Sequence, residues 1–422
     1  MKDKIIPESC PDCAGPLFAV SGYPSWCGGC DWGVAEPPEP ERVGLVRSRF
    51  ERWSARMVET LYEEVSRSPA RRPGWDGARV ASYALALCVH ACTVALLGLA
   101  VWLMVGVRNP VTVVVAIVAV LLAFAVRPRL GSLRKDREVR YRADAPALFG
   151  LLDRVAAELG AAPVHAVVAS AAYNAGYATI GLRRRRVLVL GLPLWETLSG
   201  QEKIALLGHE FAHGVNGDSR HGLIVSTSLS TLERLQSLLR PGRRDYRVNY
   251  LVDLMTRLLQ AALTSTVGWV FVFQKALVLR AGQRAEYLAD DLAARLASPE
   301  AAAQMLDALM VGQATYLFTA HQYVADTREP VYWDRLSEAL AILPESERER
   351  RRRAAARRQL RVDESHPPTH LRISVLRKRV SAEPRLVMAT GEEEQIRSEL
   401  VGDYDRLARQ LHDTAQARLY RG

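Results

Sequence analysis

His209, Glu210 and His213 are the residues of this 422-residue chain whose types and spacing are best suited to chemistry. They lie in Ile204-Ala-Leu-Leu-Gly-His-Glu-Phe-Ala-His213, an apolar stretch with helical periodicity. Residues i and i+4 share one face of a helix, so the two imidazoles can bind one metal ion while Glu210 lies beside the open coordination position. The chemistry that this arrangement permits is the activation of a metal-bound water molecule.

The elements that must position this motif are two helices. Ser199 and Glu202 form a predicted capping box directly before the apolar run. A second predicted helix carries Glu286 and Asp290 four residues apart on one face. Glu286 can supply the third protein ligand that a catalytic zinc ion needs, and Asp290 can accept the remaining N–H of a ligating histidine. The alternatives are half-buried helix histidines and a solvated surface acid.

Four sequence blocks resemble those of peptidase family M48, which includes bacterial HtpX-type membrane proteases and prenyl-protein proteases. The resemblance covers roughly residues 144 to 377. The blocks are Tyr173-Asn174-Ala175, His209 to His213 followed by Asn216-Gly-Asp218, Glu286 to Asp290, and His366-Pro-Pro-Thr-His-Leu-Arg372.

This resemblance implies a zinc metallopeptidase with His209, His213 and Glu286 as zinc ligands and Glu210 as the catalytic base. In such a site zinc lowers the pKa of a bound water to about 7, and the base takes its proton and later delivers it to the leaving amine. The resemblance therefore predicts one catalytic zinc ion and hydrolysis of peptide bonds.

The resemblance also assigns roles around the substrate. His366 and Arg372 fall where the family places groups near the substrate carbonyl, and Asn174 and Ala175 fall on a strand that borders the cleft. From the residues alone, Asn174 is also compatible with an ordinary turn, and His366 with a loop before Pro-Pro.

Short β-branched segments at residues 164–170, 175–180 and 186–190 predict a small sheet. An extended substrate that added itself to an edge strand beside the cleft would be bound through its main chain.

Two Cys-x-x-Cys knuckles near the N-terminus indicate a separate module. Cys10, Cys13, Cys27 and Cys30 have the spacing of a zinc ribbon, with all four thiolates on one structural zinc ion. A ribbon of this size is expected to dock a substrate or a protein partner that the sequence does not identify. Cys88 and Cys92 are expected to be packing residues, because nothing nearby completes a metal site. A stiff Pro-rich linker is predicted at residues 35–41.

Two apolar runs, at residues 82–107 and 111–126, predict a hairpin of membrane helices, with a buried soluble hairpin as the alternative. Basic residues flank the hairpin and predict a multi-pass protein of the cell membrane whose N-terminus and catalytic domain are cytoplasmic. No cleavable secretory signal is expected, because no apolar segment precedes residue 82. The flanking residues are Arg71, Arg72, Arg79, Arg127, Arg129, Arg134 and Lys135, with only Arg108 in the turn.

A third apolar stretch, residues 258–279, is interrupted by Gln260, Gln274 and Lys275, and a buried or membrane-lying helix is expected there. The net charge of +10 comes largely from arginine clusters. These clusters lack interleaved aromatic residues, so nucleic-acid binding is not expected. The arginine-rich segment after Glu345 is expected to be a solvated helix, and residues 392–420 an amphipathic helix.

Together these patterns predict an α+β, mainly helical protein with an HExxH (gluzincin-like) catalytic domain and a small β-sheet. The expected units are a zinc ribbon (1–35), a linker with a basic amphipathic segment (36–80), two transmembrane helices (81–128), an M48-like domain (140–385) and a C-terminal helix (386–422). The favoured function is a membrane-tethered zinc endopeptidase acting on unfolded or misfolded membrane and cytoplasmic proteins. The alternatives are a zinc-ribbon adaptor or sensor with a gated or inactive peptidase domain, and a prenyl-protein (CaaX-type) protease.

Overall fold

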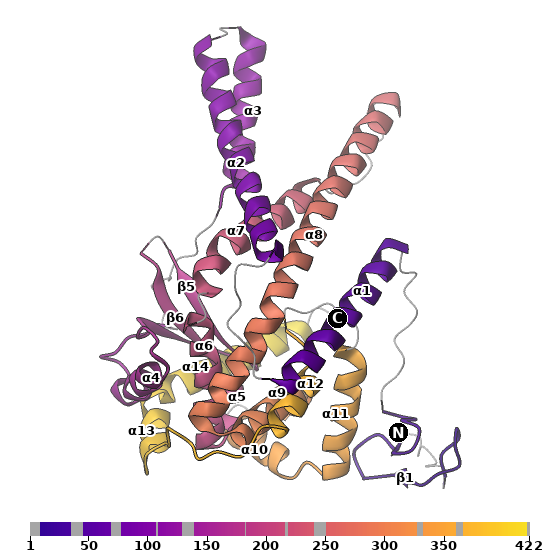
Figure 1. The fold of residues 1–422 in the computed structure, drawn as a ribbon, viewed down its shortest axis with the longest axis vertical. Helices are drawn as coiled ribbons and strands as arrows, with labels where there is room; N and C mark the ends of the chain where they lie inside the picture. Colours follow the sequence, from indigo (N-terminus) through magenta and orange to yellow (C-terminus); the bar gives the residue numbers. More distant parts are fainter. Residues whose placement is uncertain are drawn as a thin grey trace.

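The computed structural model describes residues 9–34, 45–68, 77–106, 109–128, 139–181, 183–215, 218–239, 250–326, 332–359 and 366–419. The predicted linker at 35–41, most of the basic residues that flank the hairpin, and Asn216 lie outside these ranges. In Figure 1 a helical body stands below long helices that project from it in one direction, with a small N-terminal unit at its side.

The N-terminal unit is a ribbon of two short antiparallel strands, β1 (Leu17–Phe18) and β2 (Trp26–Cys27). The next described element is α1 (Leu45–Arg67). Leu61 and Val65 of α1 pack against Tyr287 and Val375, which belong to two helices of the body. The basic amphipathic segment is therefore a helix docked on the body.

The two predicted membrane helices are present as α2 (Gly77–Gly106) and α3 (Pro110–Val126), and they form the hairpin at the top of Figure 1. Asn109 begins α3 with a capping box to Thr112, and Pro110 fits the first turn of that helix. Most large apolar side chains of α3 are exposed in the protein. A helix that is apolar on all sides and uncovered by protein is typical of a lipid environment.

The remaining elements form the body and two more projecting helices. In chain order they are β3 (Val139–Arg140), α4 (Pro146–Leu159), β4 (Ala166–Ser170), β5 (Ala175–Ile180), β6 (Arg185–Gly191), α5 (Leu192–Thr197), α6 (Gly200–Val215), α7 (Asp218–Leu239), α8 (Tyr250–Ala297), α9 (Pro299–Asp326), α10 (Tyr332–Ala341), α11 (Glu345–Gln359), α12 (Thr369–Arg377), α13 (Glu392–Glu399) and α14 (Val401–Leu419).

The predicted sheet is present in the order β3-β4-β6-β5, so β5 lies at an edge. β4 and β6 are parallel, whereas β5 runs antiparallel to β6 with Ala175 opposite Leu190. The side chain of Tyr177 on β5 packs against Phe211 of α6, with 5.8 Å between the ring centroids. This contact holds the edge strand beside the helix that carries the two histidines.

The main core lies where α4, α6, α8 and α9 meet the sheet. The segment after residue 392, predicted as one amphipathic helix, is two helices, α13 and α14, divided at Leu400. Ile396, Leu400 and Leu407 are buried in the main core. The C-terminal segment is therefore part of the body and not a separate appendage.

The third apolar stretch is not a buried helix. It lies in α8, a single helix from Tyr250 to Ala297 whose first half projects from the body (Figure 1). By length and composition, α2 and the part of α8 from Asp253 to Ala297 are the two candidate membrane spans among the described residues, and α3 is a shorter apolar helix. The protein thus has two helices that are suited to membrane association.

Candidate metal centre

Two helices bring the sequence-predicted ligands together. α6 carries His209 and His213, and its start has the predicted capping box, in which Ser199 and Glu202 hydrogen-bond to each other's backbone N–H. α6 crosses α8 closely at Gly208, where an added Cβ would lie 3.2 Å from the Cα of Ala293. A glycine at this position lets α8 approach closely enough to present Glu286 to the histidines.

The candidate ligand atoms of these three residues lie close together, all within 4.8 Å of one another. The Nε2 atoms of His209 and His213 are 3.3 Å apart. Glu286 Oε2 is 3.5 Å from His209 Nε2, and Glu286 Oε1 is 3.5 Å from His213 Nε2. Ligands that bind tetrahedral zinc at 2.0–2.1 Å are about 3.4 Å apart. The side chains are therefore already spaced to hold one zinc ion.

The state of Glu286 fits this assignment as well. Its side chain is 4% exposed, and Oε2 is a buried atom without a hydrogen-bond partner among the described residues. A buried carboxylate oxygen that lacks a hydrogen bond is costly unless a cation is bound to it. The donor set of two imidazoles and one carboxylate is one that zinc peptidases use.

Asp290 and Arg372 are buried side chains that contact the candidate ligands. Asp290 Oδ1 is 3.1 Å from His209 Nδ1, as the sequence predicted for a residue that orients this imidazole. The guanidinium of Arg372 donates to both carboxylate oxygens of Asp290 at 2.7 Å and lies 3.4 Å from Glu286 Oε2. Arg372 is 5% exposed, so this position favours holding the carboxylates over touching a substrate.

The charges of this network are mutually stabilising. Burial opposes ionisation of Glu286, but the Arg372 charge and the neighbouring His209 and His366 side chains hold the pKa of Glu286 well below its ordinary value. Burial would lower the pKa of His209, yet the neighbouring Asp290 and Glu286 carboxylates raise it to about 10. Metal binding requires the neutral imidazole of His209, so binding is expected to weaken as the pH falls.

Glu210 and His366 complete the group of residues around the ligands. Glu210 follows His209 on α6 and is 8% exposed. His366 lies just before α12 with 51% of its side chain exposed, and its Nδ1 is 2.8 Å from Glu286 Oε1. It is the most accessible side chain in contact with this centre, so it is the best placed of them to meet a bound molecule.

Asn174 and Ala175 lie where the edge strand begins. Asn174 is exposed, and its Oδ1 accepts the N–H of Ala175 at 2.9 Å. Its backbone oxygen accepts the N–H of Gly191, where an added Cβ would lie 2.1 Å from that oxygen. Only glycine fits this close approach, which fixes the start of β5 against the end of β6.

Comparison with known proteins agrees with this geometry. A sequence model described as peptidase family M48 matches residues 142–380, more than half of the chain. The chain belongs to peptidase family M48. The match contains α6, α8 and α12, and M48 membership implies metallopeptidase activity. No curated protein and no solved structure matched the chain.

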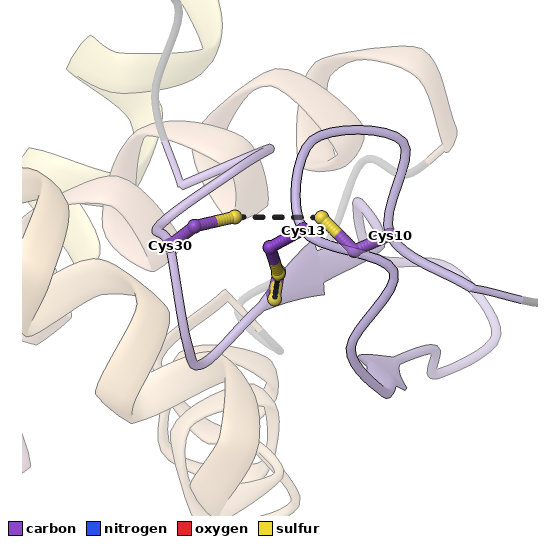
Figure 2. Close-up of side chains that lie close together, drawn as sticks. Cys10, Cys13 and Cys30 are labelled. Atoms are coloured by element: carbon purple, nitrogen blue, oxygen red, sulfur yellow. Dashed lines mark hydrogen bonds between the residues drawn. The ribbon is translucent and has the colours of Figure 1, made fainter.

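The second metal-binding group lies outside the matched M48 domain, in the ribbon. The sulfur atoms of Cys10, Cys13, Cys27 and Cys30 all lie within 4.8 Å of one another, and Figure 2 shows Cys10, Cys13 and Cys30 converging. Cys10 and Cys30 are 3.4 Å apart, and Cys13 and Cys27 3.5 Å. A tetrahedral zinc ion with 2.3 Å bonds would separate its sulfur ligands by about 3.8 Å. The backbone N–H groups of Cys30 and Gly29 lower the pKa of Cys27 to about 7, which favours its thiolate.

The ribbon docks on α11 of the M48 domain. Arg353 donates to the Gly28 carbonyl and to Asp31 at 2.7 Å, and its guanidinium lies 5.1 Å from the Trp26 ring centroid. Arg350 donates to the Val34 carbonyl at 2.9 Å. Sequence reasoning missed this contact, because no spacing pattern links the two segments.

The prediction of a solvated helix for α11 is wrong. Most of its arginines are half-buried between the ribbon and the M48 domain. Arg352 pairs with Asp307 of α9 at 2.7 Å, and Arg351 donates to the Val311 carbonyl at 3.2 Å. The arginines therefore join the ribbon to the rest of the protein. The sequence of α11 does not reveal this contact, because the helix carries like charges on every face.

Proposed function

We propose that this M48 protein is a membrane-tethered zinc endopeptidase that hydrolyses peptide bonds in unfolded or misfolded proteins. The observation that carries the proposal is the convergence of His209, His213 and Glu286, whose nearest donor atoms are 3.3–3.5 Å apart, close to the ligand separations of tetrahedral zinc. It leaves one coordination position for water, as catalytic zinc sites do.

Each residue of the centre then has a role in the reaction. When bound, zinc supplies acidification of a water molecule and polarisation of the scissile carbonyl. Glu210 takes the proton of the attacking water and gives it to the nitrogen of the leaving amine. Asp290 keeps His209 in one tautomer, and Arg372 holds the Asp290 and Glu286 carboxylates ionised and in place.

His366 is the proposed donor to the substrate oxygen. Its side chain is half exposed and reaches Glu286 at the edge of the centre, so it can meet a carbonyl oxygen that Arg372, being buried, does not reach.

The edge strand provides the proposed substrate site. β5 is hydrogen-bonded to β6 along one side and lies at the edge of the sheet, beside α6. An extended peptide can add to such an edge through main-chain hydrogen bonds, which require an unfolded segment but no particular side chain. This mode of binding favours unfolded proteins as substrates.

The apolar helices provide the proposed tether. α2, α3 and the first half of α8 expose large apolar side chains that protein does not cover. Their insertion in the cell membrane, with the M48 domain and ribbon on the cytoplasmic side, accounts for this exposure.

The test is cleavage of an unfolded model protein by the detergent-solubilised full chain, analysed by mass spectrometry of the fragments. Wild type with zinc is expected to cut, and chelation is expected to stop it. Glu210→Gln is expected to lower the rate by about 100- to 10,000-fold, because the proton acceptor is lost, while bound zinc is unchanged. Normal cleavage by Glu210→Gln, or zinc-independent cleavage by wild type, would contradict the proposal.

A further inference from the structure

The two halves of α8 have different surroundings. Large apolar side chains are exposed along α8 as far as Phe273, and beyond that point the helix enters the helical body and carries Glu286 and Asp290. The exposed apolar residues are Met255, Leu258, Leu259, Leu263, Trp269, Val272 and Phe273. One helix thus connects the proposed membrane region to a ligand of the metal centre.

Interhelical hydrogen bonds place the membrane boundary along α8. α3, the returning helix of the hairpin, ends at Val126, and Arg127 follows it. Thr231 of α7 donates to the Val126 carbonyl at 3.1 Å, and Arg234 donates to the Arg127 carbonyl at 3.0 Å. The basic end of the hairpin is therefore level with residues 231–234 of α7.

Two further hydrogen bonds relate this level on α7 to residues of α8. Ser228, about one turn before Thr231 on α7, donates to Gln274 of α8 at 3.0 Å. Thr264 donates to the Leu239 carbonyl at 3.1 Å, so α7 and α8 run antiparallel with a matched register. In this register the end of α3, which is level with residues 231–234 of α7, lies beside residues 268–272 of α8. Gln274 and the adjacent Lys275 follow within one turn toward the metal centre, and among the described residues of α8 no large apolar side chain beyond Phe273 is exposed.

Glu286 lies more than three helical turns beyond Gln274, which corresponds to about 18 Å along the axis. The catalytic end of α8 has little freedom to move, because α6 packs tightly against it at Gly208. We propose that α8 sets a fixed height for the metal centre, about 18–21 Å along the helix axis from the membrane boundary near residues 272–274 to Glu286. This proposal rests on the peptidase function proposed above and adds a rule for its substrates.

The rule concerns proteins that are themselves anchored in the membrane. An extended chain advances about 3.3 Å per residue, so about six residues are needed to reach the centre from the bilayer. A membrane-anchored substrate is therefore cut only at bonds about six or more residues from its own membrane segment. Bonds closer to the bilayer are out of reach even where the chain is unfolded.

The experiment uses the full-length protein in liposomes with synthetic substrates. Each substrate has an apolar span of about 20 residues and an unfolded polar tail. One cleavable sequence, identified from digestion of a soluble unfolded protein, is placed about 3, 6, 9 or 12 residues from the span, reaching about 10, 20, 30 or 40 Å. The matched controls are the same tails without the span.

Anchored substrates are expected to be uncut at the shortest spacing and to be cut at the rate of their unanchored controls at the two longest. Equal cleavage of all four anchored substrates would overturn the height rule. If wild type with zinc leaves the unanchored tails uncut, the peptidase function itself fails, and the height is then decided by a measurement that does not use activity.

That measurement compares two cysteine variants, Leu263→Cys and Arg284→Cys, with a water-soluble maleimide. The exposed fractions of the two native side chains are similar, 44% and 48%, so the protein alone does not distinguish them. In liposomes Leu263→Cys is expected to react about tenfold or more slowly, because hydrocarbon excludes the reagent and disfavours the thiolate. The wild-type rate is subtracted, since Cys88 and Cys92 are exposed on α2. Equal rates would place both positions in water and overturn the proposal.

Discussion

The two candidate metal-binding groups of this protein are built in opposite ways. The ligands of the metal centre come from α6 and α8, two long helices whose side chains pack in the main core. The ribbon cysteines come from a small unit with two-residue strands, whose few buried apolar residues include Trp26 and Val34. The surrounding fold positions the ligands of the metal centre. In the ribbon, by contrast, a bound metal ion would have to hold the fold together.

The ligands differ for the same reason. Four thiolates close the coordination of a metal ion and contribute directly to folding of a unit too small for a sufficient core. Two imidazoles and one carboxylate leave a position open for water, so the surrounding protein must fix them. Asp290 and Arg372 do this in the metal centre. Support by neighbouring side chains is therefore what distinguishes the site that is suited to chemistry.

The largest expected effects are reciprocal losses of zinc. His213→Ala is expected to lose the zinc of the metal centre and all cleavage, yet to keep the ribbon zinc. Cys10→Ser is expected to lose the ribbon zinc and to unfold residues 9–34, while the M48 domain keeps its structure. Zinc content per chain by elemental mass spectrometry and hydrogen exchange of each unit measure both effects. If Cys10→Ser leaves zinc content unchanged, the ribbon assignment is wrong.

A smaller effect is expected from the residue that orients His209. Asp290→Asn keeps the shape of the side chain but removes the charge that pairs with Arg372, so zinc affinity of the metal centre should fall about 10- to 100-fold. Competition with a chelator measures this affinity. The matched control is Asp291→Asn, which breaks a buried pair with Arg379 at 3.0 Å away from the centre. An equal loss of zinc affinity in the control would show that the effect is general destabilisation.

The smallest expected effect concerns the joint between the two units. Arg353→Gln removes the charged contacts to Gly28 and Asp31 and should weaken docking of the ribbon by about 1 kcal/mol, or about fivefold, because the pair is partly exposed. Protease accessibility of the ribbon measures the change. Arg352→Gln is the control, since Arg352 pairs with Asp307 and not with the ribbon. If both variants expose the ribbon equally, Arg353 is not a specific contact.

The features predicted correctly from the sequence are those that depend on near neighbours in the chain. The capping box at Ser199, the i and i+4 pairing of the histidines, the Cys-x-x-Cys knuckles and the three strands are all present. Each depends on a fixed local geometry, which is the pitch of a helix, the two-residue period of a strand, or the short distance that a two-residue loop leaves between its flanking cysteines. The family resemblance placed Glu286 and Asp290 beside these histidines, which helical pitch alone does not do.

The wrong predictions concern surfaces that are buried or exposed by distant segments. The helix α11 reads as solvated because all its faces are charged, but the ribbon and α9 cover it. Residues 258–279, interrupted by Gln260, Gln274 and Lys275, read as a buried or membrane-lying helix. Only the buried alternative is wrong, because most of the described residues of this stretch are not buried, although Gln274 is fully buried against Ser228 of α7.

Short stretches of sequence therefore determined which residues could bind a metal ion, because spacing along a helix or loop brings the two histidines, or each pair of cysteines, close together. Only the tertiary structure decided what surrounds those stretches. The pairing of Arg372 with Asp290, the docking of the ribbon on α11 and the continuity of α8 from its lipid-suited half to Glu286 all join residues that no local period relates. Such contacts form when separate helices pack, and packing depends on the shape of the whole core.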